Sequence, residues 1–310
     1  MKKILLISVL AFGLLFTSNA QQDAMFTHYM FNTIAINPAY AGSRDALTVT
    51  GLHRSQWVSF DGAPTTQTIN MHSPLLFKNT GIGLSFINDA IGPTNTTGFF
   101  LDFSYKIKVS QKAHLAFGLK AGMNMMSNEL NQLATGDALD PAFSQNIQSK
   151  LLPNFGFGLY YFTDKYYIGA SSPKLLENDF AENSTSGNTN PASEEKHYFF
   201  IAGTILTLNQ DLKLKPTTFV KVTAAAPMEV DLTGTLYFRD QIWLGAMFRT
   251  GDAAGLLAGM NITDQFAFGY SYDWSFTNTS FRYNGGSHEV MLRYDFIFGE
   301  KQKIRSPRYF

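Results

Sequence analysis

The chain has 310 residues, with 24 Lys and Arg against 24 Asp and Glu, so its formal net charge is zero. It lacks the basic excess that nucleic-acid binding needs, and nucleic acid is not expected as a partner. The sequence contains no Cys, which excludes disulfides and thiolate metal sites. Phe and Tyr are frequent, at 28 and 14, yet the mean hydropathy is only −0.07, so apolar residues are abundant but interleaved with polar ones.

The N-terminus predicts a secretory signal peptide over residues 1–20. Lys2 and Lys3 precede an apolar run over 4–16, and the small residues of 18–20 suit cleavage after Ala20. An N-terminal membrane anchor is the less favoured alternative, because the apolar run is too short to span a bilayer comfortably. The mature chain is therefore expected to be exported.

After residue 44, apolar and polar side chains alternate with a period of two. In the stretch HEVMLRYDFIF (288–298), Val290 and Leu292 share one face and Arg293 and Asp295 the other. The same pattern recurs in every clear segment up to residue 298. Alternation of this kind predicts an all-β protein whose strands have one apolar and one polar face.

A soluble β-sandwich could produce the same alternation. The signal peptide, the number of long strands, and aromatic residues at strand ends such as Tyr105, Tyr272 and Trp274 favour an outer-membrane barrel. A sheet in lipid must close, because an open edge leaves backbone groups unpaired. The apolar face is then expected to contact outer-membrane lipid and the polar face to line the lumen.

About 14 strands are expected, joined alternately by short and long connections. Tight turns follow every second strand, and the two longest connections, 129–151 and 173–196, both lie on the other side. Short periplasmic turns, long outer loops and periplasmic termini are typical of bacterial barrels. The predicted strands are 45–59, 64–74, 80–89, 95–108, 112–128, 152–162, 165–172, 197–208, 211–222, 228–239, 241–250, 253–262, 265–275 and 287–298.

The sequence thus predicts a transmembrane antiparallel β-barrel over 45–298, preceded by a plug or cap segment over 21–44 and followed by a periplasmic tail over 299–310. The polar connection 173–196 is expected to be a surface loop rather than a ligand site.

The charges on the polar face allow two interpretations: an ion-selective pore, or ion pairs that fill a closed lumen. A selective pore usually carries a ring of one sign. The signs here are balanced, which favours mutual pairing, since unpaired charges in a dry lumen are costly. The candidate lumenal charges are Asp102, Lys120, Lys213, Lys215, Glu229, Asp231, Arg239, Arg249, Arg293 and Asp295.

No catalytic or metal-binding pattern emerges from the sequence. The six His are scattered, without an i, i+4 pair and without Cys partners. The chain is therefore expected to be no enzyme and to need no cofactor. A hydrolase site assembled from distant strands is the alternative left open.

The two ends of the chain carry its most specific motifs. The segment QQDAMFTHYMFN followed by NPAYAG, within 21–42, resembles the start of the PorP/SprF family of outer-membrane proteins of the type IX secretion system. LTVTGLHRSQWVSFDGAP (47–64), INMHSPL (69–75) and the terminal IRSPRYF (304–310) continue the resemblance, while the middle matches in strand pattern.

The resemblance implies a non-enzymatic role in secretion or surface anchoring of large adhesins through their C-terminal signal domain, as in gliding motility of Bacteroidetes. It also implies periplasmic secretion components as partners, including a peptidoglycan-binding protein. An outer-membrane channel for small or hydrophobic solutes is the alternative function.

Residues 21–44 do not alternate and cannot form a lipid-facing strand. We expect the segment to begin on the periplasmic side, and its aromatic side chains to be buried, preferably as a plug in the lumen and otherwise as a cap on the periplasmic mouth. The candidate plug or partner contacts are Phe26, Tyr29, Phe31, Asn37, Pro38 and Tyr40. In the tail, the candidate residues of an assembly signal or docking peptide are Arg305, Pro307, Arg308, Tyr309 and Phe310.

Overall fold

The computed structural model describes residues 24–75, 79–129, 147–179, 193–224, 226–276 and 285–297. Two short helices, α2 (Thr33–Ile36) and η1 (Pro38–Tyr40), precede the sheet. The strands are β1 (Leu47–Ser55), β2 (Thr65–Pro74), β3 (Thr80–Ile91), β4 (Thr94–Lys108), β5 (Ala113–Asn128), β6 (Ile147–Thr163), β7 (Tyr166–Ser172), β8 (His197–Thr204), β9 (Leu206–Thr207), β10 (Leu212–Thr223), β11 (Ala226–Phe238), β12 (Ile242–Arg249), β13 (Ala253–Asn261), β14 (Phe266–Ser275) and β15 (Ser287–Phe296).

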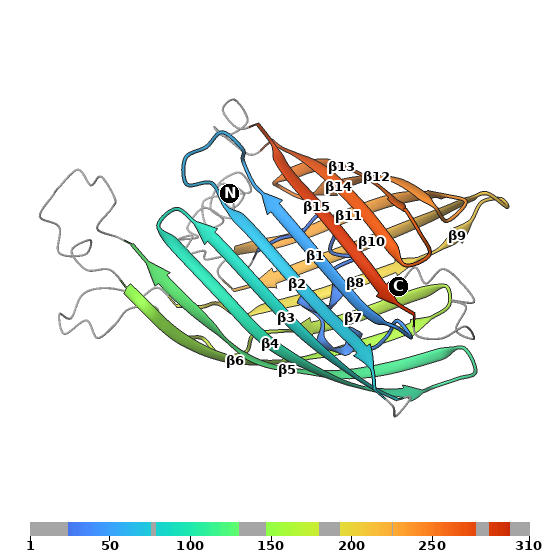
Figure 1. Ribbon diagram of the computed structural model, residues 1–310, viewed down its shortest axis with the longest axis horizontal. Helices are drawn as coiled ribbons and strands as arrows, with labels where there is room; N and C mark the ends of the chain where they lie inside the picture. Colours follow the sequence, from blue (N-terminus) through green and yellow to red (C-terminus); the bar gives the residue numbers. More distant parts are fainter. Residues whose placement is uncertain are drawn as a thin grey trace, which may run out of the picture.

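The strands form a closed antiparallel β-barrel (Figure 1). Neighbours in the chain pair with each other, β1 pairs with β15, and β10 pairs with both β8 and β11, which completes the ring. The short β9 also pairs with β10, so β8 and β9 are two parts of one interrupted strand. The prediction of a 14-stranded antiparallel barrel is confirmed.

Side chains alternate between the two faces of the sheet as the sequence predicts. In β12, Ile242 and Leu244 are 49% and 60% exposed, while Trp243 and Met247 are buried. Large apolar side chains therefore cover the outer face of the barrel, where the alternative of a soluble sandwich would place polar ones. Among the described residues, neither helix has the length and apolar composition to cross a membrane.

The barrel has two distinct ends. At the short-turn end, β1 begins, β15 ends, and tight turns such as 109–112 and 239–241 join neighbouring strands. At the long-loop end lie the longest connections, 129–146 and 173–196. The two longest connections thus share one end, although the β3–β4, β10–β11 and β12–β13 connections at that end are as short as the turns at the other.

Three strands differ most from the sequence prediction. β1 ends at Ser55 rather than near residue 59. β6 begins at Ile147 rather than near residue 152. The polar residues 148–150 and Pro153 show no alternation, so the sequence does not indicate this part of the strand. The strand predicted over 197–208 is divided into β8 and β9 at Ile205, although the backbone N–H of Ile205 still donates to the carbonyl of Lys165 in the register of the β7–β8 pair.

Candidate functional site

Residues 24–44 lie against the inward-facing side chains of the barrel. Tyr29, Ile34 and Tyr40 are almost fully buried and belong to one cluster with wall residues such as Tyr160 and Phe199. Burial of large aromatic side chains stabilises strongly, which accounts for a segment rich in them. The segment is therefore packed as part of the protein interior.

The segment runs from one end of the barrel to the other. Ala24 lines a cavity beside Asp89 and Thr96, which lie next to the β3–β4 connection at the long-loop end. Arg44 lies at the opposite end, bound to Asp295 near the end of β15. The prediction that residues 21–44 begin on the same side as β1 is wrong for residue 24, because sequence order gives no sign that the chain first crosses the lumen.

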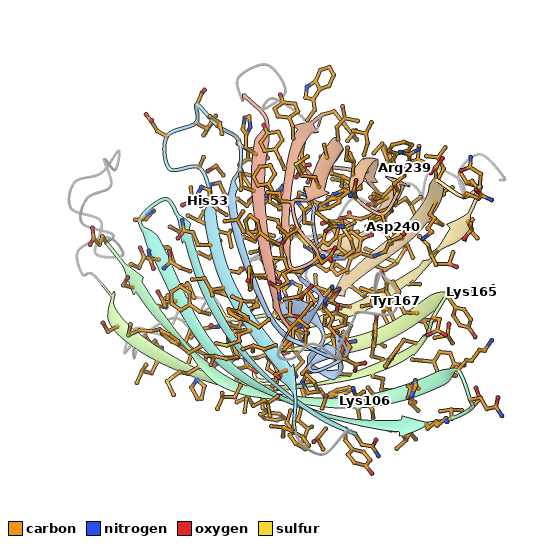
Figure 2. The ribbon with its side chains drawn as sticks, turned by 45° about the vertical axis from the view of Figure 1, so that its right-hand side comes forward. His53, Lys106, Lys165, Tyr167, Arg239 and Asp240 are labelled. Carbon is orange, nitrogen blue, oxygen red and sulfur yellow. The ribbon has the colours of Figure 1, made fainter. Side chains whose placement is uncertain are left out.

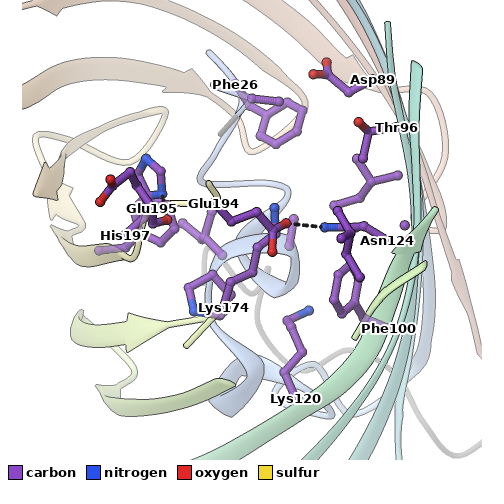
Figure 3. Close-up of a pocket in the computed structure, with 18 residues that line it drawn as sticks. Phe26, Asp89, Thr96, Phe100, Lys120, Asn124, Lys174, Glu194, Glu195 and His197 are labelled. Atoms are coloured by element: carbon purple, nitrogen blue, oxygen red, sulfur yellow. Dashed lines mark hydrogen bonds between the residues drawn. The ribbon is translucent and has the colours of Figure 1, made fainter. Parts of the chain in front are cut away.

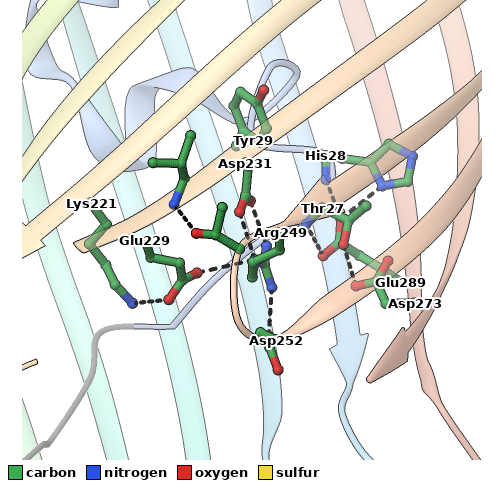
Figure 4. A network of polar contacts seen from close by, with 12 residues as sticks. Thr27, His28, Tyr29, Lys221, Glu229, Asp231, Arg249, Asp252, Asp273 and Glu289 are labelled. Carbon is green, nitrogen blue, oxygen red and sulfur yellow. Dashed lines mark hydrogen bonds and ion pairs between the residues drawn. The ribbon is translucent and has the colours of Figure 1, made fainter. Parts of the chain in front are cut away.

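At the long-loop end, an ion-pair network fixes the start of the segment (Figure 4). The backbone N–H groups of Thr27 and His28 donate to the Glu289 carboxylate at 2.9 and 2.7 Å, and His28 Nδ1 lies 2.8 Å from Glu289 Oε1. Arg54 Nη1 bonds Asp273 Oδ2 at 2.6 Å and Glu289 Oε2 at 3.2 Å. These side chains are buried, so each charge depends on its partners.

In the middle of the barrel, aromatic rings hold the segment. The Tyr29 hydroxyl lies 2.9 Å from Thr217 Oγ1, and the Tyr29 ring packs against Phe219. The Phe31 ring centroid lies 5.2 Å from that of Trp243, a fully buried side chain of β12. Figure 4 shows Tyr29 beside Asp231 on the inner wall.

The turn at 37–40 sits against the backbone of the wall. Asn37 caps η1, since its Oδ1 accepts from the N–H of Ala39 at 3.0 Å, and Pro38 occupies the favoured first position of that helix. Asn37 Nδ2 also donates to the carbonyl of Leu159 at 3.0 Å. A Cβ at Gly118 would collide with Pro38 and Ala39, so only glycine at this wall position admits the turn.

At the short-turn end, the segment is tied to the wall by charges. Arg44 binds the Asp295 carboxylate with Nε and Nη2, at 3.3 and 2.9 Å, and Thr48 Oγ1 donates to the same group at 2.6 Å. Lys106 Nζ donates to the carbonyl of Gly42 at 2.8 Å. Both ends of the segment are thus held by side chains of the barrel.

A second ion-pair network lies on the inner wall of β10–β12 (Figure 4). Arg249 lies at its centre, with its guanidinium 2.8 Å from Asp231, 3.1 Å from Glu229 and 3.5 Å from Asp252. Lys221 Nζ lies 3.3 Å from the Glu229 carboxylate. Opposite charges on neighbouring strands therefore partner each other across the sheet.

Most of the predicted lumenal charges point inward, and one, Arg239, lies elsewhere. Lys120 pairs with Asp102 at 2.9 Å inside the barrel. Arg239 is wrong as a lumenal charge: β11 ends at Phe238, and Arg239 lies in the following turn at φ +51°, 63% exposed and paired with Asp211 (Figure 2). Lys213 faces inward near this turn and pairs with Asp240 at 2.7 Å. The inward-facing predicted residues are Asp102, Lys120, Lys213, Lys215, Glu229, Asp231, Arg249, Arg293 and Asp295.

The sequence alone did not identify the barrel residues that contact the N-terminal segment. Arg54 and His72 are buried on the inner wall, and neither was a candidate. The alternation in LTVTGLHRS does place Arg54 on the face opposite the exposed His53, so the signal was present. The pattern does not identify the partner of Arg54, because Asp273 lies 219 positions away in the chain and alternation describes only neighbouring residues.

The connection 173–196 is not simply a surface loop at its described ends. The Glu194 carboxylate accepts from the side-chain amides of Asn124, Asn154 and Asn178 at 3.0, 3.2 and 2.6 Å. Asn124 and Asn154 lie on the inner wall of β5 and β6. The prediction of a surface loop therefore holds for Leu176, Glu177 and Asp179, which are exposed, and is wrong for Glu194, which binds the inner wall, while 180–192 lies outside the described residues.

Several predictions concern residues that the structure does not describe. These are the signal peptide, the tail 299–310 and its candidate docking residues. Within the described ranges, His, Asp and Glu side chains form no group of three or more that could hold a metal ion.

Solved structures with similar folds are outer-membrane barrels. The CymD monoaromatic hydrocarbon channel matches with a TM-score of 0.52 at 11% identity, over 88% of this chain and 93% of that chain. Omp33 of Acinetobacter baumannii matches at 0.48 and 9% identity, over 81% and 98% of the chains. A Pseudomonas aeruginosa FadL homologue matches at 0.46 and 13% identity, over 90% and 96% of the chains. At such identities the likeness concerns the fold alone.

The comparison with curated proteins gave no match. The model of the type IX secretion system membrane protein PorP/SprF matches residues 18–294, nearly the whole chain, in agreement with the motifs at its N-terminus. The protein belongs to the PorP/SprF family of type IX secretion system membrane proteins.

Proposed function

We propose that this barrel is a non-enzymatic outer-membrane component of type IX secretion that helps to secrete or anchor a large adhesin, through the C-terminal signal domain of that adhesin. In this proposal the long-loop end faces the cell exterior, and the short-turn end, with the tail 299–310, faces the periplasm. Residues 24–44 close the lumen as a plug. The cargo is then held by the barrel and does not pass through it.

The observation that supports the proposal is the packing of residues 24–44 against the inner wall in a member of this family. Residues 24–44 are anchored at both ends, by Glu289 at one and Asp295 at the other, and pack against the wall between them. A solute channel needs a continuous open path, whereas an anchor needs only a rigid frame and a surface. The buried aromatic contacts supply that rigidity.

The periplasmic partners follow from the family and remain part of the proposal. They are secretion components at the inner side of the outer membrane, including a peptidoglycan-binding protein, with the tail residues Arg305 and Arg308 to Phe310 as a docking peptide. Adhesin anchoring of this kind would serve gliding motility. No catalytic step or cofactor is invoked.

A channel for small or hydrophobic solutes is the second candidate function. The fold shared with the CymD channel is compatible with it, but similarity at 11% identity concerns the barrel and not its contents. A channel would require residues 24–44 to leave the lumen or to leave a path beside them.

Gentle purification of the full-length protein from its native outer membrane, followed by mass spectrometry, tests the proposal. We expect a large secreted protein with a C-terminal signal domain to co-purify, together with periplasmic secretion components. A barrel of unrelated sequence purified from the same membranes is the control. Isolation of the protein without such partners would contradict the anchoring function.

A further inference from the structure

A partly enclosed cavity of about 110 Å³ lies at the long-loop end (Figure 3). It is built jointly by the N-terminal segment and the inner wall. Phe26 and Ile36 come from the segment, and Ile87, Phe100 and Leu152 come from β3, β4 and β6. The cavity therefore exists only while the segment occupies the barrel.

The size of the cavity limits its occupant. Apolar cavities of about 150 Å³ take one benzene molecule, so about 110 Å³ suits a single branched aliphatic side chain. It is too small for a lipid acyl chain, which would need a long groove. Nine of the 18 residues that line it are apolar, which makes burial of such a group favourable.

Carboxylates line the cavity, among them those of Glu194 and Glu195 (Figure 3). Three neutral amides, those of Asn124, Asn154 and Asn178, hold the Glu194 carboxylate in place without cancelling its charge. The nearby Lys120 is neutralised by Asp102 at 2.9 Å, and its ammonium also lies over the Phe100 ring. Lys174 also lines the cavity, but the three carboxylates of Asp89, Glu194 and Glu195 outnumber it, so the lining favours a further cation next to the apolar group.

We infer that this cavity is an anchor site for one aliphatic side chain of a partner polypeptide that carries a Lys or Arg beside it. Side chains that fill well-packed pockets supply much of the binding free energy at protein interfaces, and complementary charges beside them add specificity. The inference rests on the proposed function, because the outward orientation of the long-loop end makes the site available to a secreted protein.

Photo-crosslinking in intact cells tests the inference. The photoreactive residue p-benzoylphenylalanine replaces Thr96, which lines the cavity, and in a matched variant it replaces Phe86, which faces outward from β3. We expect the Thr96 variant to crosslink a secreted polypeptide at a stretch with an aliphatic residue beside Lys or Arg. The Phe86 variant should crosslink lipid.

A synthetic peptide with the sequence of the crosslinked stretch is then titrated onto the purified full-length protein, and its binding affinity is measured. Ile87→Trp, which fills the cavity, should weaken peptide binding about tenfold or more. Leu84→Trp, on the outer face of the same strand, should leave it unchanged, and Glu195→Lys should weaken it by charge repulsion. Heat-modifiable migration on gels checks that each variant remains a folded barrel.

Three results would overturn the inference: no crosslink from residue 96, a crosslink only to lipid or to residues of the same chain, or peptide binding that Ile87→Trp does not change. Any of them can occur while the adhesin still co-purifies, which would leave the proposed function intact. Loss of the co-purifying adhesin from the unmodified protein would instead refute the proposed function.

Discussion

The charged side chains at the long-loop end are buried, and burial of a charge costs free energy unless a partner compensates it. Arg54 lies between Asp273 and Glu289, and Glu289 also accepts two backbone N–H groups of the N-terminal segment. A buried ion pair contributes little beyond an apolar substitute of equal volume, but the loss of one partner leaves the others uncompensated. Specificity comes from the His28 side chain, whose Nδ1 lies 2.8 Å from Glu289 Oε1, because every residue except Pro could supply the two backbone N–H groups.

Removal of the Arg54 side chain tests this at the level of one residue. Arg54→Ala should lower the free energy of unfolding by about 3–5 kcal/mol, since Asp273 and Glu289 then stay buried without their cation. Urea unfolding followed by tryptophan fluorescence measures the change. Arg239→Ala, which breaks the exposed pair with Asp211, should cost less than about 1 kcal/mol, and equal effects of the two variants would contradict this account.

For single residues, the sequence predicts the face of the sheet on which a side chain lies better than it predicts the residues that the side chain contacts. Period-two alternation correctly indicates that Asp231 and Asp295 face inward, because side-chain parity is a local property of a strand. It fails at Arg239, where the strand ends and parity no longer applies. It cannot show that Arg44 meets Asp295, since the two lie 251 positions apart and only barrel closure brings them together.

At the scale of elements, the N-terminal segment and the wall are fitted to each other. The turn that contains η1 approaches β5 and β6 so closely that Gly118 and Gly158 have no room for a side chain. Strand glycines at such positions mark a close approach of another backbone. The sequence shows the glycines as part of the polar face, but it does not show what approaches them.

A valine at Gly118 should displace this turn. Gly118→Val should cost about 1–3 kcal/mol through overpacking and should make Trp243, which packs on Phe31 of the same segment, more accessible to acrylamide. The measurement uses a background with Trp57→Phe and Trp274→Phe, where Trp243 alone emits. Gly51→Val on β1, where a Cβ meets nothing within 4 Å, is the matched control and should leave the quenching unchanged. Equal quenching in both variants would contradict the close fit.

At the scale of the whole molecule, the barrel closes without the segment. Closure depends on backbone pairing between β1 and β15 and between β10 and β11, neither of which involves residues 24–44. This closure, the strand number and the short and long connections could be predicted from the sequence, because they follow from alternation and turn residues. The path of the segment from the long-loop end to the short-turn end could not, because no periodic pattern specifies it.

Deletion of residues 23–40 should therefore leave a folded barrel with an open lumen. We expect stepwise ion conductance in planar bilayers, since the deletion removes the side chains that fill the interior. Heat-modifiable migration of the variant on gels checks its folding. A folded deletion variant that stays silent would show that other parts of the chain block the path.

The conductance of the unmodified full-length protein tests the central claim most directly, namely that this family member holds its cargo and does not conduct solutes. In a planar bilayer, with the deletion variant as the positive control, the account predicts a silent barrel. Steady open-channel currents from the unmodified protein would contradict it and would favour the solute channel.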